Sequence, residues 1–222
     1  MDIIRNKAGE ITGIKISGTI FIQGYGANDE KAEELNNYSN KTVKSKEING
    51  INVSVNITYK YDNKKNKKDL KAGENILTFS SENGRSHVVA RKKEINGTTQ
   101  RFTGNTGTIF KNSNENRAVL HESLHLLGLS DRYDDYRESN LGPAYSTPNI
   151  GFEKDIMGGG TNVNSFHYDQ WMKHAIFRSK HNSNTNRVLG YTAADVNANG
   201  RKRSPYERGG THKPDINAEN TY

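Results

Sequence analysis

The chain has 222 residues, a formal net charge of +7 and 32% hydrophobic residues, so it can bury a core while carrying many polar loops. It contains no cysteine, which excludes disulfides, thiolate metal sites and cysteine catalysis and leaves histidines and carboxylates to hold any metal. No run approaches the roughly 18–20 apolar residues of a membrane span, and residues 1–10 lack the apolar segment of a secretory signal. We therefore expect no membrane span, and any export by a signal-independent route.

Alternating apolar residues indicate strands in the first half of the chain. The clearest case is INVSVNITYKY, residues 51–61, in which every second side chain is apolar or aromatic. A short helix, rich in Glu, Ala and Leu, is expected over residues 27–38, and a Lys- and Asn-rich loop leads to about Gly73. In chain order, strands are expected over residues 11–23, 51–61, 76–79, 86–90 and 107–110.

Two helices are predicted in the second half. The first, over residues 116–127, carries a stripe of leucines and meets Gly128, where a helix tends to end. A loop with two prolines is expected over residues 132–151, and the second helix over 165–178. Strands followed by helices predict an α+β fold class.

The composition divides the chain into two parts. Residues 1–178 are expected to form one domain, because they hold all the predicted elements. Residues 179–222 are polar, basic and rich in Asn and Gly, which predicts a C-terminal extension that contributes no essential part of the core.

The stretch HESLHLLGLSD, residues 121–131, points to a metal site. His121 and His125 are four residues apart, so both imidazoles lie on one face of a helix and can reach one ion. Gly128 can adopt the left-handed conformation that ends a helix, after which the chain can turn so that Asp131 offers a third ligand. Asp134 and Asp135 are alternative third ligands, should the chain turn later.

Glu122 gives this ligand set a catalytic interpretation. Two histidines and a carboxylate leave one position of a tetrahedral ion open to water, as in catalytic zinc sites. Zinc lowers the pKa of such a water toward about 7, and Glu122 can then take its proton as the general base. Imidazole and carboxylate ligands favour Zn²⁺ as the cofactor, with other divalent ions as alternatives.

With these residues, HExxHxxGxxD, the chain resembles the metzincin metallopeptidases, in the variant in which aspartate replaces the third histidine, as in snapalysin-like enzymes. DIMGGG, residues 155–160, resembles their Met-turn, with Met157 as the hydrophobic floor below the metal. The resemblance covers about residues 10–178. It implies a twisted, mostly parallel sheet with the active-site helix beneath it, a cleft-lining edge strand and a C-terminal helix. Residues 86–90 are the expected edge strand, with 107–110 as the alternative.

One feature departs from some members of the family, because no tyrosine stands two residues after Met157. A tyrosine ligand of the astacin kind is therefore not implied. Residues 127–133 also resemble the metallopeptidase toxin domains at the C-termini of bacterial polymorphic and RHS-type effectors. This second resemblance implies delivery into a target cell, release from or membership of a longer chain, and a cognate immunity protein as a partner.

These observations predict a zinc metalloendopeptidase acting on a protein or peptide substrate. Two alternatives stay open: a nucleic-acid-binding or nuclease toxin, suggested by the charge of +7, and a zinc-dependent binding module without catalysis. Basic side chains do cluster near residues 60–71 and 201–203, but few aromatic residues accompany them, so nucleic acid is not the expected partner. The remaining histidines are expected to be surface or packing residues: His87, His167, His174, His181 and His212.

Overall fold

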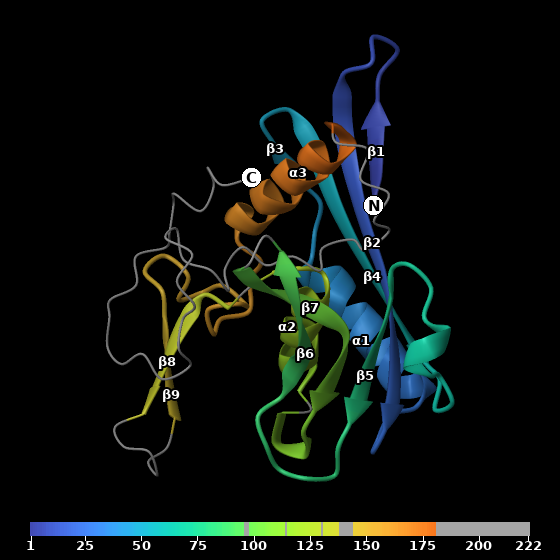
Figure 1. The fold of residues 1–222 in the computed structure, drawn as a ribbon, viewed down its shortest axis with the longest axis vertical. Helices are drawn as coiled ribbons and strands as arrows, with labels where there is room; N and C mark the ends of the chain where they lie inside the picture. Colours follow the sequence, from blue (N-terminus) through green and yellow to red (C-terminus); the bar gives the residue numbers. More distant parts are fainter. Residues whose placement is uncertain (96–97, 114, 130, 138–143, 181–222) are drawn as a thin grey trace.

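The computed structural model describes residues 1–95, 98–113, 115–129, 131–137 and 144–180 (Figure 1). A seven-stranded sheet forms the centre of the fold. Its strands are β1 (Asp2–Arg5), β2 (Ile11–Gly24), β3 (Lys46–Ile48), β4 (Ile51–Tyr61), β5 (Glu74–Phe79), β6 (His87–Ile95) and β7 (Thr98–Ile109). The strand order is β3-β4-β2-β5-β7-β6, with β1 paired to β2 off this path.

Strand direction differs between the middle and the margins of this sheet. The four central strands, β4, β2, β5 and β7, are parallel. In contrast, β1, β3 and β6 are each antiparallel to the strand that they pair with. The sheet is thus mixed, which agrees with the predicted α+β class.

Three α-helices and a separate hairpin complete the described part of the chain. The helices are α1 (Asp29–Thr42), α2 (Asn116–Leu126) and α3 (Ser165–Lys180), and the hairpin consists of β8 (Tyr133–Arg137) and β9 (Ala144–Pro148). Short 3₁₀ turns cover Lys67–Asp69 and Lys111–Ser113. Helix α1 connects the parallel strands β2 and β4, and α1 and α2 pack on each other and on the sheet, whereas α3 lies against β3 and β4 (Figure 1).

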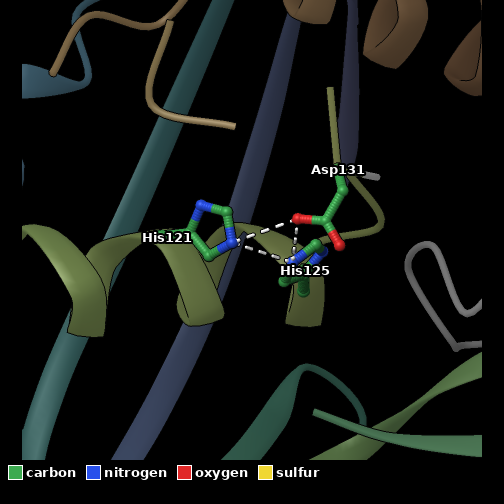
Figure 2. A group of neighbouring side chains, drawn as sticks. All are labelled: His121, His125 and Asp131. Carbon is green, nitrogen blue, oxygen red and sulfur yellow. Dashed lines mark hydrogen bonds and ion pairs between the residues drawn. The ribbon is translucent and has the colours of Figure 1, made fainter. Parts of the chain in front are cut away.

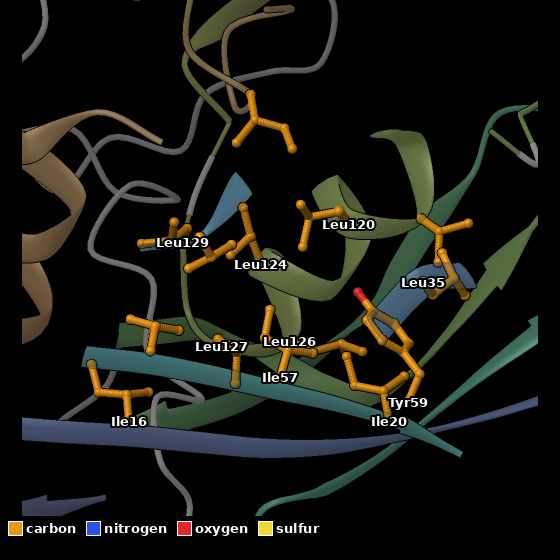
Figure 3. Close-up of a cluster of buried hydrophobic side chains, with 14 of the residues drawn as sticks. Ile16, Ile20, Leu35, Ile57, Tyr59, Leu120, Leu124, Leu126, Leu127 and Leu129 are labelled. Atoms are coloured by element: carbon orange, nitrogen blue, oxygen red, sulfur yellow. The ribbon is translucent and has the colours of Figure 1, made fainter. Parts of the chain in front are cut away.

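The two long central strands present one apolar face to these helices. In β2 the even-numbered residues Ile14, Ile16, Ile20 and Ile22 are completely buried, while Lys15 between them is exposed. The period of two follows from the alternation of side chains along a strand. Figure 3 shows the leucines of α2 and of the turn after it above Ile16, Ile20 and Ile57, so the helix that carries the candidate ligands is anchored in the core.

Most of the predicted elements are confirmed. The strand over residues 51–61 has the expected bounds, and the helices over 116–127 and 165–178 differ from α2 and α3 by one or two residues. Residues 86–90 do fall at an edge, because β6 ends the strand order, whereas 107–110 belong mainly to β7, which is paired on both sides.

Two expectations about the elements are wrong. The loop predicted over residues 132–151 contains the β8–β9 hairpin, and the strands near residues 90 and 107 extend well into the polar segment between them. Both hairpins consist largely of charged and polar residues, so apolar alternation was absent although Tyr and Thr suit a strand. Strands β1 and β3 were also not expected, because each is only three or four residues long.

Among the described helices, none combines the length and the apolar character that crossing a membrane requires. Helix α3 continues to Lys180, two residues beyond the predicted domain boundary. The predicted extension therefore lies outside the described residues from residue 181 onward, and the boundary itself stays a prediction.

Candidate metal centre

Helix α2 presents His121 and His125 on one face, while its opposite face is buried. Leu120 and Leu124 have no exposed surface, and Ser123 is also fully buried, where its hydroxyl accepts a hydrogen bond from Tyr59 Oη at 2.8 Å. Ser123 Oγ in turn donates to the Val119 carbonyl at 2.7 Å. The hydrogen bond from Tyr59 ties α2 to β4, and the spacing of four residues places both imidazoles on the same side of the helix (Figure 2).

The turn after α2 brings Asp131 to these histidines. Gly128 has a φ of 90°, a left-handed conformation that glycine adopts without the steric cost of a Cβ atom. The Gly128 amide donates to the His125 carbonyl at 2.8 Å, and Leu129 N to the Leu124 carbonyl at 3.0 Å. Trp171 of α3 stabilises this turn, because its Nε1 donates a hydrogen bond to the Leu127 carbonyl at 3.0 Å.

Three candidate ligand atoms converge in front of the helix (Figure 2). Asp131 Oδ1 lies 3.2 Å from His121 Nε2 and 3.1 Å from His125 Nε2, and the two Nε2 atoms are 3.2 Å apart. A tetrahedral ion with bonds of about 2.1 Å separates its ligand atoms by about 3.4 Å. The three atoms therefore form a nearly regular triangle of the size that one small ion requires, and they form a group that could hold a metal.

The other nitrogen of each histidine decides where the proton is. His121 Nδ1 is 2.8 Å from the Ile156 carbonyl oxygen, and His125 Nδ1 is 2.8 Å from that of Leu129. A carbonyl only accepts, so each Nδ1 carries a hydrogen, and with a cation at the centre each ring would direct the lone pair of Nε2 toward it. Asp131 Oδ1 is buried and lies within ion-pairing distance of both Nε2 atoms, at 3.2 and 3.1 Å. In this arrangement two imidazoles and one carboxylate face the same point, which suits a cation.

The Asp131 carboxylate favours a positive charge on the imidazole beside it. Burial alone would lower the pKa of His125, but the Asp131 carboxylate beside it raises that pKa to about 9. Burial would likewise raise the pKa of Asp131, yet His125 and His121 hold it well below its usual range. Both pKa shifts have the same meaning: a positive charge between these side chains is favoured.

Glu122 lies beside this centre in a different environment. It is 6% exposed, and its Oε2 has no hydrogen-bond partner among the described residues. Burial raises the pKa of Glu122, while His125 and His121 oppose the rise and His87 on β6 opposes it more weakly. A buried carboxylate with a raised pKa is suited to accept a proton near neutral pH.

Tyr133 and Arg85 border the centre and contact each other. The sequence alone does not indicate this pair. Tyr133 stacks on His121 with ring centroids 6.1 Å apart and 20° between the planes. Arg85, just before β6, donates from Nη2 to Tyr133 Oη at 3.0 Å. Burial and then the nearby Asp131 raise the pKa of Tyr133, so its hydroxyl keeps its proton. Nothing local in the sequence connects Tyr133 with Arg85, which is 48 residues away.

Arg132 anchors the segment between Asp131 and Tyr133 on the opposite side. Its guanidinium lies 4.4 Å from the Phe166 ring centroid and 5.3 Å from that of Phe152. Its amide donates to the Met157 carbonyl at 2.8 Å. Because side chains alternate in an extended segment, Asp131 and Tyr133 face the centre while Arg132 faces α3.

Met157 is completely buried in the turn before α3, and its role as a Met-turn stays a prediction. Its neighbour Ile156 supplies the carbonyl that accepts the hydrogen bond from His121. Asp155, also buried, accepts a hydrogen bond on Oδ1 from Met157 N at 2.8 Å. The turn therefore contacts the first candidate ligand through its backbone.

The structure describes the side chains of only two of the other candidates, His87 and His167. Asp134 and Asp135 are in β8, and their side chains fall outside the described residues, as does that of His174. His181 and His212 are also outside them. His87 is exposed on β6, whereas His167 is completely buried and contacts Asp155, so these two are the surface and packing residues that we expected.

No family model, characterised protein or solved structure matches this chain in the three comparisons that we made.

Proposed function

We propose that this chain is a zinc-dependent endopeptidase of metzincin type. The observation that carries the proposal is the triangle of His121 Nε2, His125 Nε2 and Asp131 Oδ1, with sides of 3.1–3.2 Å, next to the buried carboxylate of Glu122. A binding module has no need of a buried carboxylate without a partner, whereas a hydrolase needs a base at this position.

Zinc fits the donor set better than other common ions. Two imidazoles and one carboxylate, spaced for tetrahedral coordination, are ligands that zinc accepts, while Ca²⁺ and Mg²⁺ prefer six or more oxygen ligands. Both imidazoles are oriented by a backbone carbonyl on Nδ1, which is the usual outer contact of a metal-binding histidine. Asp131 Oδ1 is buried and faces both Nε2 atoms, so a cation held between the three atoms would satisfy all of them.

Bound zinc supplies Lewis acidity, which polarises a peptide carbonyl and makes a water acidic. Glu122 takes the proton of the attacking water and later passes it to the nitrogen of the leaving amine, so it acts first as base and then as acid. Its raised pKa favours uptake of the proton in the first of these steps. His121, His125 and Asp131 would hold the zinc ion in place, and Met157 forms the hydrophobic floor of the turn.

Strand β6 supports an extended peptide as the substrate. It is an edge strand, so one row of its backbone donors and acceptors is free of a neighbouring strand within the described sheet. A substrate can add to such an edge as a further strand. The start of this strand lies near the centre, because Arg85, just before it, contacts Tyr133, and His87, its first residue, influences the pKa of Glu122.

The test is hydrolysis of a proteome-derived peptide library, read by mass spectrometry. We expect new cleavage products with the zinc-loaded protein, none after treatment with a chelator, and recovery when zinc is restored. A protein that binds one zinc per chain but produces no cleavage above the Glu122→Gln control would contradict the proposed activity.

We further propose that the domain acts as a toxin delivered into a target cell, with an immunity protein as its partner. The resemblance of residues 127–133 to effector metallopeptidase domains supports this setting. Induced expression inside bacterial cells tests it: the unaltered chain should stop growth, and Glu122→Gln should not. Equal growth with both chains would remove the support for a toxin, without bearing on peptide hydrolysis.

A further inference from the structure

We propose that Asp155 and His167 are positioning residues, which hold the Ile156 carbonyl against His121 and thereby set the orientation of the first metal ligand. The inference rests on the proposed metal site but not on peptide hydrolysis. It concerns a buried pair outside the ligand group, formed between the turn after β9 and helix α3.

The Asp155 carboxylate accepts three hydrogen bonds. Oδ1 accepts from Met157 N at 2.8 Å and from His167 Nε2 at 2.9 Å, and Oδ2 accepts from Asn164 N at 2.7 Å. Asp155 is 2% exposed and His167 is not exposed at all. Burying two polar side chains is costly unless their hydrogen bonds are made, so this pair closes the turn with a specific geometry.

The same turn restrains the peptide groups on both sides of Ile156, because Met157 N donates to Asp155 Oδ1 on the side of the Ile156 carbonyl. The Ile156 amide donates to the Asn162 carbonyl at 2.7 Å, and the Asp155 carbonyl accepts from Gly158 N at 3.0 Å and from Gly160 N at 2.7 Å. The Ile156 carbonyl is left to accept from His121 Nδ1 at 2.8 Å. Asp155 and its contacts therefore fix the one acceptor that orients the His121 ring.

The protonation of His167 agrees with this role. Its Nδ1 is buried without a hydrogen-bond partner among the described residues, while Nε2 faces the Asp155 carboxylate. The ring is therefore neutral with its hydrogen on Nε2, and burial lowers the pKa of His167 accordingly. A side chain that only filled space would not need this hydrogen.

His125 provides an internal control. Its Nδ1 hydrogen bond goes to the Leu129 carbonyl in the turn after α2, and neither Asp155 nor His167 contributes to that turn's hydrogen bonds. A change in the Asp155–His167 pair should therefore alter His121 and leave His125 unchanged. General destabilisation would affect both.

The experiment uses zinc-loaded protein labelled with ¹⁵N in histidine. In the unaltered chain we expect His167 to carry its hydrogen on Nε2, and the Nδ1 hydrogens of His121 and His125 both to exchange slowly with water. His167→Leu should accelerate exchange at His121 only and raise the zinc Kd by about 10- to 100-fold, the usual effect of losing an outer-shell contact. His167→Gln, which can still donate to Asp155, should restore most of the affinity.

Asp169→Asn serves as the matched control, because Asp169 lies on the same helix and forms an ion pair with Lys173 at 2.9 Å, away from the turn. It should change neither His121 exchange nor the zinc Kd. The proposal is overturned if His167 in the unaltered chain carries its hydrogen on Nδ1, a result that needs no variant. It is also overturned if His167→Leu lowers Tm while zinc affinity and His121 exchange stay as they were.

Discussion

Glu122 and His121 are neighbours in the chain, but their roles are separable. Glu122 contributes none of the three candidate ligand atoms, so replacing it should leave the ligand group intact. We expect Glu122→Gln to keep about one zinc per chain and to lose on the order of 10²–10⁴ in peptide hydrolysis, the weight of a general base. Metal content and cleavage rate should be measured on the same preparation. Hydrolysis at the unaltered rate would show that another group is the base.

Asp131 is the ligand candidate on the least regular part of the chain, directly before β8. Asp131→Ala removes one of three donors and should raise the zinc Kd by at least about 100-fold, because two imidazoles alone bind zinc weakly. Asp134→Ala and Asp135→Ala make the same chemical change nearby and should leave the Kd within about threefold of the unaltered chain. Competition with graded chelators compares the three, and a sensitive Asp134 or Asp135 would identify a different third ligand.

His167 predicts a pH dependence of stability. Its pKa in the folded protein is lowered by burial, so the unfolded chain binds the proton more readily below the ordinary histidine pKa of about 6.5. Its contribution to stability is therefore complete above about pH 6.5 and is lost as the pH falls, by at most about 1.4 kcal/mol per pH unit. His167→Gln lacks this proton site. Urea unfolding of chelated protein at pH 7.5 and 5.5 should show the stability advantage of the unaltered chain over His167→Gln shrinking on acidification. A constant or growing difference would contradict a neutral, buried His167.

At the scale of elements, the end of α2 determines whether Asp131, which lies before β8, can share one ion with the two histidines of the helix. Gly128 has a φ of 90° there. Gly50, in the turn between β3 and β4, has a φ of 77°, and no atom lies within 4 Å of the place where its Cβ would be. Alanine at either position pays a similar backbone cost, about 1–2 kcal/mol. We expect both variants to lower the free energy of unfolding comparably, but only Gly128→Ala to weaken zinc binding, because only that turn carries Asp131. Equal zinc Kd values for the two variants would show that the turn does not control the ligand geometry.

Local patterns predicted the elements that have a strong periodicity and missed those that do not. Strand β4 alternates over its whole length, and α2 combines a leucine stripe with a terminal glycine, so both could be assigned within one or two residues. The β8–β9 hairpin has no apolar face in its sequence, so local periodicity does not predict its pairing. Its two strands are YDDYR and AYSTP. Its start, from Asp131 to Tyr133, is defined by Arg132, which bonds to the turn containing Met157.

The same distinction applies to the candidate centre. His121, His125 and Asp131 could be proposed from spacing alone, because a helix repeat and one glycine turn bring them together. The contacts of Arg85 with Tyr133 and of the Ile156 carbonyl with His121 could not, because they join residues 48 and 35 positions apart. Only the order of strands in the sheet and the packing of α3 bring those segments to one place.

For the whole molecule, the described residues already contain a core that includes α3. Trp171, Met172 and Ala175 are buried in it, and the candidate ligands lie between residues 121 and 131. We therefore expect a chain ending at residue 181 to bind zinc and to cleave small peptides at close to the full rate, while binding of protein substrates weakens. Zinc content, peptide cleavage and Tm of the shortened chain test the proposed domain boundary. An aggregated or zinc-free product would mean that the extension completes the domain.

Trp171 is the single tryptophan of the chain. Its indole nitrogen donates a hydrogen bond to the Leu127 carbonyl, in the turn that leads to Asp131. Indole emission depends on the polarity and hydrogen bonding around the ring, so this turn has a natural optical reporter. Removing or restoring zinc should shift the emission of the unlabelled protein, and stopped-flow recording would give the rate at which the turn closes around the ion. Each variant discussed above can be followed by the same signal without any added dye.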